Sequence, residues 1–543
     1  MRKRLVAALA ALLLAECAFA RDFPAYLRMS GTKIEGQGNG SVPDNLVIPD
    51  GVTEIGTEAF KNCFWLKSVT IPSSVKEIGY GAFYCCLALA EVTFAGTKAA
   101  WEKTKRGASL FEMTGVTVIR CTDGDIPLSE VSAAASAQGF PSYLKMDGTK
   151  VMGFTGLVED VEIPEGVTEI GKEAFARHFK IKRVTIPSSV KEIGEQAFAG
   201  CSGLERVTIK PGVKKIGRYA FHVCTALQSI EVPASVTEIG DGAFAGSGLT
   251  HFTFRGNLKE IVMMAFSGCT SLKTVTIEKG ITKICLEAFS GCTSLTSMTI
   301  PEGVTTIESN AFAFCTSLAS VTIPRSVRKI GEKAFIGCAF TRVTIPESVT
   351  TIEKGAFSDC TSLVSITIPS SIRAIDDYMF SGCTSLVSVT IPPTVKAIGG
   401  SAFSGCTSLK AVTIPSGITA IEMGTFNGCT SLTSVTIPAS VREICQAAFR
   451  NCASLKEVAL PNSIEVIGSS AFTRCASLAS ITIPASVKEI GEAAFLDCPS
   501  LKDVRYRGTK DKWRNLKRGA FIFSATSAKL VHCSDGDLSA ILD

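Results

Sequence analysis

Apolar residues recur along most of the chain with a period of 23 residues, which shortens twice to 22. Phenylalanine marks this period most clearly. Fifteen coils are marked by Phe175, Phe198, Phe221, Phe244, Phe266, Phe289, Phe312, Phe335, Phe357, Phe380, Phe403, Phe426, Phe449, Phe472 and Phe495. Phe60 and Phe83 mark two more coils nearer the N-terminus. Self-similarity at a fixed period of this length predicts a stack of structural repeats rather than a set of unrelated domains.

One unit reads L-x-x-V-T-I-P-x-S-V-x-x-I-G-x-x-A-F-x-G-C-T-S, and Leu386 to Ser408 match it almost completely. The β-branched residues 389–391 alternate inward and outward, which predicts a short strand. Pro392 ends that strand because it lacks the N–H that a continuing ladder needs. Residues 395–398 predict a second short extended piece. Residues 402–406 predict about one helical turn that points its apolar side chains inward.

A single coil of this kind cannot bury its own apolar residues, whereas a stack of coils can. The pattern therefore predicts a repeat solenoid: a curved stack of short parallel strands joined by short extended or helical turns. With neighbouring strands ~4.8 Å apart, fifteen coils would extend roughly 70 Å.

A second symmetry divides the chain into two arrays. The segment 23–33 recurs as 140–150, and Trp101 and Cys121 recur with the same spacing as Trp513 and Cys533. We interpret these as matched start and stop caps, because the terminal coils of a solenoid would otherwise expose core. The sequence predicts a signal peptide over 1–20, a short array of two full repeats plus caps over 21–125, an Ala/Ser-rich linker over 126–139, and a long array of fifteen repeats plus caps over 140–543.

The N-terminal segment has the features of an export signal. Residues 2–4 are basic, residues 5–15 are apolar but too few to span a bilayer, and residues 18–20 form an A-x-A cleavage site. The mature protein would then begin at Arg21. Residues 14–17 also allow an alternative interpretation, in which they form a lipobox and Cys17 carries a lipid anchor. No later stretch is long and apolar enough to predict a transmembrane helix.

The repeat resembles the BspA-like, or treponemal-type, leucine-rich repeat, whose hallmark is L-x-x-V-x-I-P followed by I-G-x-x-A-F-x-x-C. The resemblance covers residues from about 40 to 520 in seventeen near-copies. Members of that family are typically secreted or surface-exposed, and several act as adhesins for host matrix glycoproteins or for other cells, so the resemblance implies such a role here. The repeat by itself establishes only a scaffold, since one fold can host many activities.

Composition excludes several other classes. A mean hydropathy of +0.29 and a net charge of only +5 exclude a disordered chain. The 55 basic residues are interleaved with 50 acidic ones, which argues against a nucleic-acid partner. The chain has neither a G-x-S-x-G elbow nor a G-x-x-x-x-G-K-[ST] loop, and its four histidines have no zinc-site spacing. We therefore expect no enzyme activity, no cofactor and no metal site.

Cysteine follows phenylalanine by three residues in fifteen of the seventeen coils, with His178 and Ser247 in the other two. Neighbouring coils are close enough for disulfides, so distance alone leaves that possibility open. The unbroken column from Cys269 to Cys498 has eleven members, an odd number. We favour a buried, reduced column over scattered disulfides or a metal site, because small thiols are common core residues.

The outward side of the first strand is the candidate ligand-binding face. With Val and Ile of V-T-I inward, the Thr and the residue before Val point outward, mostly as hydroxyl side chains. Such columns are also ordinary sheet surface. Charged residues interrupt them near both ends. The candidate face comprises Arg183, Arg206, Glu231, His251, Arg342, Thr367, Thr390, Thr413, Glu457 and Asp503.

Two functions follow from this interpretation. The first is an exported, non-enzymatic binding protein, an adhesin whose strand face recognises a protein or glycoprotein of a host matrix or cell surface. The alternative is a structural protein of the envelope or periplasm without a host ligand.

Overall fold

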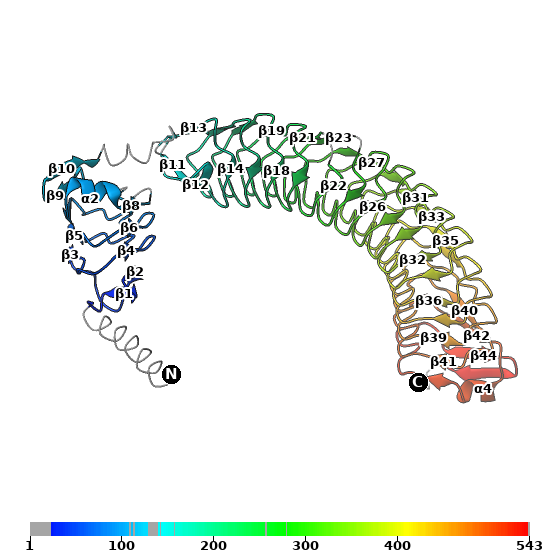
Figure 1. Ribbon diagram of the computed structural model, residues 1–543. Helices are drawn as coiled ribbons and strands as arrows, with labels where there is room; N and C mark the ends of the chain where they lie inside the picture. Colours follow the sequence, from blue (N-terminus) through cyan, green and yellow to red (C-terminus); the bar gives the residue numbers. More distant parts are fainter. Residues whose placement is uncertain are drawn as a thin grey trace, which may run out of the picture. The chain divides into compact units, whose positions relative to one another are not determined.

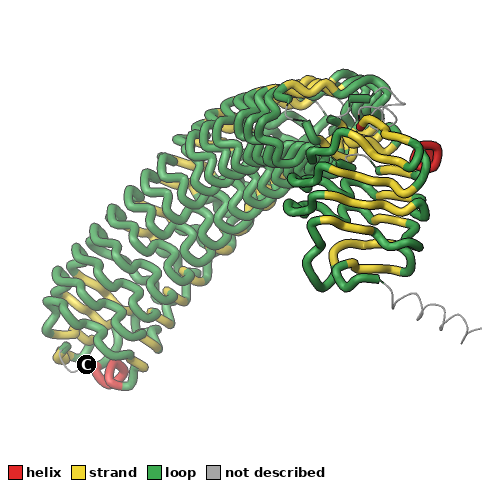
Figure 2. The backbone as a smooth tube through the Cα atoms, turned by 90° about the vertical axis from the view of Figure 1, so that its left-hand side faces the viewer, coloured by secondary structure: helices red, strands yellow, loops and turns green. Residues whose placement is uncertain are grey.

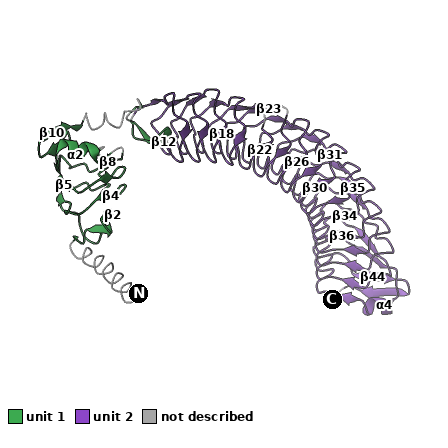
Figure 3. Cartoon of the chain, viewed as in Figure 1, with its two compact units in different colours: residues 1–156 green, residues 157–543 purple. Residues whose placement is uncertain are grey.

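The computed structural model describes residues 23–128 and 140–540, except residues 108–109, 112–113, 142, 157, 256–257 and 279. It divides into two compact units, residues 1–156 and 157–543 (Figure 3). The predicted signal peptide, Cys17 and residues 129–139 of the predicted linker lie outside the described residues. Strand β10 (Gly124–Pro127) extends two residues into the segment assigned to the linker. The division into two capped arrays stays a prediction.

The first unit holds two sheets, with strand orders β1-β2-β4-β6-β8 and β10-β9-β7-β5-β3. Within these sheets β1 pairs with β2 and β9 pairs with β10 as antiparallel hairpins, and the coils between them pair in parallel. Strands β11 and β12 form a further antiparallel hairpin. Its elements are β1 (Leu27–Ser30), β2 (Lys33–Gln37), β3 (Asn45–Val47), β4 (Glu54–Ile55), β5 (Ser68–Pro72), β6 (Glu77–Ile78), β7 (Glu91–Ala95), α2 (Lys98–Lys103), β8 (Lys105–Arg106), β9 (Val118–Cys121), β10 (Gly124–Pro127), β11 (Leu144–Asp147) and β12 (Lys150–Phe154).

The second unit is a curved stack of coils (Figure 1), most of which contribute two short parallel strands. Loops and turns form the larger part of each coil (Figure 2). The first series of strands comprises β13 (Asp160–Glu162), β15 (Arg183–Ile186), β17 (Arg206–Ile209), β19 (Ser229–Glu231), β21 (His251–Phe254), β23 (Thr274–Ile277), β25 (Ser297–Thr299), β27 (Ser320–Thr322), β29 (Arg342–Thr344), β31 (Ser365–Thr367), β33 (Ser388–Thr390), β35 (Ala411–Thr413), β37 (Ser434–Thr436), β40 (Ser480–Ile483) and β42 (Asp503–Tyr506).

The second series comes from the V-x-x-I segments and their Ile and Leu variants, except for β43, which lies in the stop segment. It comprises β14 (Glu169–Ile170), β16 (Glu192–Ile193), β18 (Lys215–Ile216), β20 (Glu238–Ile239), β22 (Glu260–Ile261), β24 (Lys283–Ile284), β26 (Thr306–Ile307), β28 (Lys329–Ile330), β30 (Thr351–Ile352), β32 (Ala374–Ile375), β34 (Ala397–Ile398), β36 (Ala420–Ile421), β38 (Glu443–Ile444), β39 (Val466–Ile467), β41 (Glu489–Ile490) and β43 (Lys517–Arg518). The stop segment adds α4 (Lys510–Arg514) and the antiparallel pair β44 (Leu530–Cys533) and β45 (Gly536–Ser539).

The period of 23 residues sets the register of the stack. Val184 of β15 lies beside Val207 of β17, and Ile186 lies beside Ile209. Both strands bury these residues and leave the intervening position outward. The predicted solenoid of short parallel strands is therefore confirmed, because identical positions of successive coils become neighbours and build continuous apolar columns.

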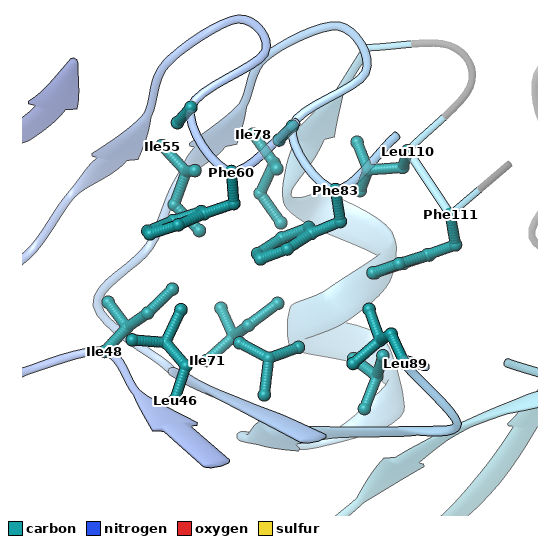
Figure 4. Close-up of a cluster of buried hydrophobic side chains, with 14 of the residues drawn as sticks. Leu46, Ile48, Ile55, Phe60, Ile71, Ile78, Phe83, Leu89, Leu110 and Phe111 are labelled. Atoms are coloured by element: carbon teal, nitrogen blue, oxygen red, sulfur yellow. The ribbon is translucent and has the colours of Figure 1, made fainter. Parts of the chain in front are cut away.

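Phenylalanine fills the centre of each coil. The rings of Phe380 and Phe403 are stacked with centroids 5.5 Å apart, and Phe403 and Phe426 follow at 5.6 Å. In the first unit, Figure 4 shows the equivalent stack of Phe60, Phe83 and Phe111 above a layer of buried Leu and Ile side chains. These stacked rings continue the core from one coil to the next.

The segment around each phenylalanine is a chain of reverse turns rather than the helical turn that the sequence predicts. In the coil of Phe403, the amide of Ala402 donates to the carbonyl of Gly399, and the amide of Cys406 donates to Phe403. Ser401 and Gly405 have φ of 55° and 73°, which an α-helix does not allow. The amides of Ser401, Phe403 and Gly405 instead donate to the next coil. Alternate amides thus donate hydrogen bonds within the coil and between coils, so each of these buried backbone N–H groups has an acceptor.

Candidate binding face

The outward side of the first series, here called the hydroxyl face, carries two exposed columns. Ser365 lies beside Ser388, and Thr367 lies beside Thr390, in adjacent parallel strands. Ile366 between them is buried, and both threonines are exposed. Because neighbouring strands lie ~4.8 Å apart, each column presents one polar group per coil at a regular spacing.

The structure brings only some of the candidate residues together. Arg183 and Arg206 are direct neighbours in the column before Val. Glu231 stands instead in the threonine column, beside Thr208. Arg342 follows Arg206 by six coils, which places the two about 29 Å apart along the column. The candidate residues therefore form dispersed contacts along an extended face and do not converge on one pocket.

The other candidate residues take their places along the same face. His251 pairs with Thr274, Thr413 with Thr436, and Asp503 with Ser480. Glu457 is exposed but lies in a coil whose first segment forms only an isolated bridge at Ala459. Ionisable residues interrupt the hydroxyl columns at His251, Glu457 and Asp503, as the sequence indicates.

Arg183 already has a partner, which sequence analysis did not identify. Its Nε lies 2.7 Å from Oδ1 of Asp160, and its Nη2 donates to Oδ2 at 2.7 Å. This two-pronged contact raises the pKa of the Arg183 guanidinium through the hydrogen bond and the charge of Asp160. The signal was present in the sequence, because Asp160 precedes Arg183 by one period. Among the described residues, no ion pair joins Arg206 or Arg342 to a carboxylate.

The cysteine columns lie inside the coils as free thiols in the described chain. Burial raises the pKa of Cys360, Cys406 and Cys452 to about 12. Such thiols are poor nucleophiles and poor metal ligands, because both roles need the thiolate. The described residues contain no group of three or more His, Cys, Asp or Glu side chains placed to hold a metal ion.

No helix among the described residues is long and apolar enough to cross a bilayer.

Comparison with known proteins identifies relatives of the repeat. The model of the BspA type leucine-rich repeat region, in six copies, matches residues 41–121, 154–273, 248–364, 312–431 and 419–533. A leucine-rich repeat protein from Bacteroides ovatus ATCC 8483 is 32% identical, with a TM-score of 0.56; the alignment covers 69% of this chain and 96% of that one. A leucine rich cell surface protein from Faecalibacterium prausnitzii A2-165 is 30% identical, covering 69% and 94%, with a TM-score of 0.37. No curated protein matches the chain.

Proposed function

Because the chain belongs to the BspA-type leucine-rich repeat family, we propose that it is an exported, non-enzymatic adhesin. Its hydroxyl face recognises a protein or glycoprotein of a host matrix or of another cell. Repeat proteins of this kind use exposed side chains on a rigid ladder to hold macromolecular partners. One observation carries the proposal: two exposed polar columns run in register along the first series, with cations at Arg206 and Arg342 that form no ion pair within the described part of the chain.

These two arginines are free to form charge-assisted hydrogen bonds with a partner. Arg183 contributes less to binding, because Asp160 already occupies its guanidinium. The threonine hydroxyls between them can each donate and accept one hydrogen bond, which suits the hydroxyl and amide groups of a glycoprotein. The affinity would then be the sum of weak contacts over several coils and would not require one deep pocket.

The test is binding of the purified protein to immobilised fibronectin, fibrinogen, laminin and collagen. The informative variant is Arg206→Glu combined with Arg342→Glu. Arg450→Glu combined with Lys512→Glu is the matched control, because it makes the same charge change at exposed positions away from the hydroxyl face. We expect the first variant to weaken binding by about tenfold or more, as loss of a charge-assisted contact does, and the control to bind normally.

Equal binding by both variants would place the contact elsewhere on the molecule. If the protein binds none of the panel, and external protease leaves it intact on whole cells, the adhesin proposal is wrong and a structural envelope role replaces it.

A further inference from the structure

A second surface of the solenoid carries an unpaired row of cations. It is formed by the residue that follows the buried Val or Ile and precedes each strand of the second series. In five successive coils this position holds Arg328, Thr350, Arg373, Lys396 and Thr419, here called the basic column. Arg328, Arg373 and Lys396 are exposed. In Figure 1 the labelled strands of the second series lie nearer the inner side of the curve than those of the first.

Towards both ends of the second unit, residues in or beside this position form ion pairs between neighbouring coils. Lys215 lies between Glu192 and Glu238, 3.4 Å from a carboxylate oxygen of each. Glu465 lies between Arg442 and Lys488, at 2.9 and 2.5 Å. In these coils carboxylates therefore stand close to the cations and oppose the approach of an anionic ligand.

The middle of the second unit, residues 354–441, differs from its ends in its ion pairs. No ion pair joins any two of residues 354–441, all of which the structure describes. The Arg373 guanidinium donates through Nη1 to the carbonyl of Ser370 at 2.9 Å, and its remaining N–H groups are left for other acceptors. The Lys396 side chain lies across Gly417 of the next coil, where its ammonium meets no carboxylate.

The positions on both sides of Arg373 and Lys396 are neutral. On one side lie Ala374, Ala397 and Ala420, which begin β32, β34 and β36. On the other side, Ser371 and Thr394 donate their hydroxyls to carbonyls of the preceding coil. Beyond these flanks the carboxylates are partly engaged: Glu347 accepts hydrogen bonds from Ser370, and Glu353 pairs with Lys329. Asp376 and Glu422 lie at the bend of their coils, outside the neutral flank.

The cations lie at whole-coil intervals along the column. Arg373 and Lys396 are one coil apart, and Arg328 and Arg373 are two coils apart, which corresponds to ~4.8 and ~9.6 Å along the column. The adjoining strands β32 and β34 are enclosed by further coils of the stack on both sides, which leaves no room for an added peptide strand at their edges. The alanine flank has no large apolar side chain that would anchor a peptide. These features suit a linear chain that carries an anion on each unit.

We propose that the basic column binds a linear sulfated glycan, with its sulfate groups on Arg328, Arg373 and Lys396. The guanidinium forks hold sulfate through paired hydrogen bonds, and Lys396 acts as a point charge. This surface is separate from the hydroxyl face, so the inference goes beyond the adhesin proposal and does not rest on it.

The experiment measures binding of the full-length protein to heparin. The variant combines Arg373→Glu with Lys396→Glu. The matched control combines Lys191→Glu with Lys214→Glu, because these residues are also neighbours in the same repeat position but lie beside the ion-paired residues Glu192, Lys215 and Glu238 rather than beside a neutral flank. We expect the first variant to bind heparin about tenfold or more weakly, as each lost charge-assisted contact requires, and the control to bind within about twofold of the unchanged protein.

Raising the salt concentration weakens binding of the unchanged protein, because exposed charges are screened.

Circular dichroism of each variant shows whether the coils remain folded, which the exposure of all four positions leads us to expect. Equal loss in both variants, or equal binding to uncharged dextran, would overturn the proposal. Tighter binding to poly-glutamate than to heparin would overturn it in favour of an acidic peptide. The variant Arg206→Glu with Arg342→Glu should keep heparin binding, so failure of the adhesin proposal and failure of this one give different results.

Discussion

The thiol of Cys406 donates a hydrogen bond to the main-chain carbonyl of Phe380, one coil earlier, at 3.2 Å. The same carbonyl accepts the amide of Cys383 within its own coil. The contact recurs with donor–acceptor distances of 2.9 to 3.2 Å for Cys86, Cys201, Cys224, Cys269, Cys292, Cys315, Cys338, Cys360, Cys383, Cys429, Cys452, Cys475 and Cys498. The cysteine column is therefore a set of hydrogen bonds between coils as well as core filling.

The first prediction follows from this contact. Cys406→Ala removes the donor and leaves a small cavity, so we expect it to lower the free energy of unfolding by about 1–2 kcal/mol. Cys406→Ser keeps a donor at the same place and should cost less. Ser247 occupies the equivalent slot in its coil, where its Oγ lies 3.3 Å from the thiol of Cys269. Urea unfolding of both variants checks the order, and a larger loss for Ser than for Ala would contradict it.

The second prediction concerns alkaline pH. Burial raises the pKa of Cys315, Cys360 and Cys406 to about 12, whereas an exposed thiol titrates near ~8.5. The unfolded chain therefore releases thiol protons before the folded protein does. Stability is unaffected below that range and falls as pH rises from about 8.5 towards 12. Urea midpoints measured across this range should decrease steadily, and a constant midpoint would show that the thiols are not held protonated.

Thiol labelling checks the same burial at a neutral pH. In the native protein, a thiol reagent should modify Cys85, Cys121 and Cys533, which are partly exposed. Fully buried members such as Cys406 should react only after denaturant is added. Rapid native labelling of Cys406 would contradict the buried column.

The third prediction uses the left-handed positions that flank each phenylalanine. Gly405 has a φ of 73° and Ala447 a φ of 56°. A Cβ on Gly405 would meet the backbone of Gly382 at 3.6 Å, an ordinary contact, so backbone strain dominates. Gly405→Ala should therefore lower stability by about 1 kcal/mol, whereas Ala447→Gly relieves the same strain and should be neutral or stabilising. Thermal unfolding compares the two, and equal losses would contradict the turn geometry.

The fourth prediction concerns the stop segment. Oδ1 of Asp535 accepts the amide of Lys510 at 2.8 Å, at the start of α4, and Thr509 caps the same helix. Asp123 makes the equivalent contact with Lys98 at 2.7 Å in the first unit. Asp535→Ala should cost about 1 kcal/mol, as loss of a capping interaction does. Because repeat arrays unfold from weakened ends, hydrogen exchange should speed up in β44 and β45 before the central coils.

Prediction from sequence succeeded where one coil repeats the next. The inward positions of Val184 and Ile186, and the burial of Cys406, follow directly from the 23-residue pattern. It was wrong for the turn around Phe403, because spacing alone does not distinguish one helical turn from reverse turns whose amides bond to a neighbouring coil. It also missed the partner of Arg183, since Asp160 stands in an incomplete first coil that the pattern did not highlight.

The sequence by itself determined the repeat, the solenoid and the columns of the core, because a strict period leaves only in-register stacking to bury the apolar positions. The tertiary structure decided which polar groups remain available. Arg183 is paired with Asp160, whereas Arg206, Arg373 and Lys396 form no ion pair among the described residues, although all are basic residues at regular repeat positions. The reason is that an ion pair forms only where an oppositely charged side chain lies one coil away. Such side chains come into contact only when the coils stack.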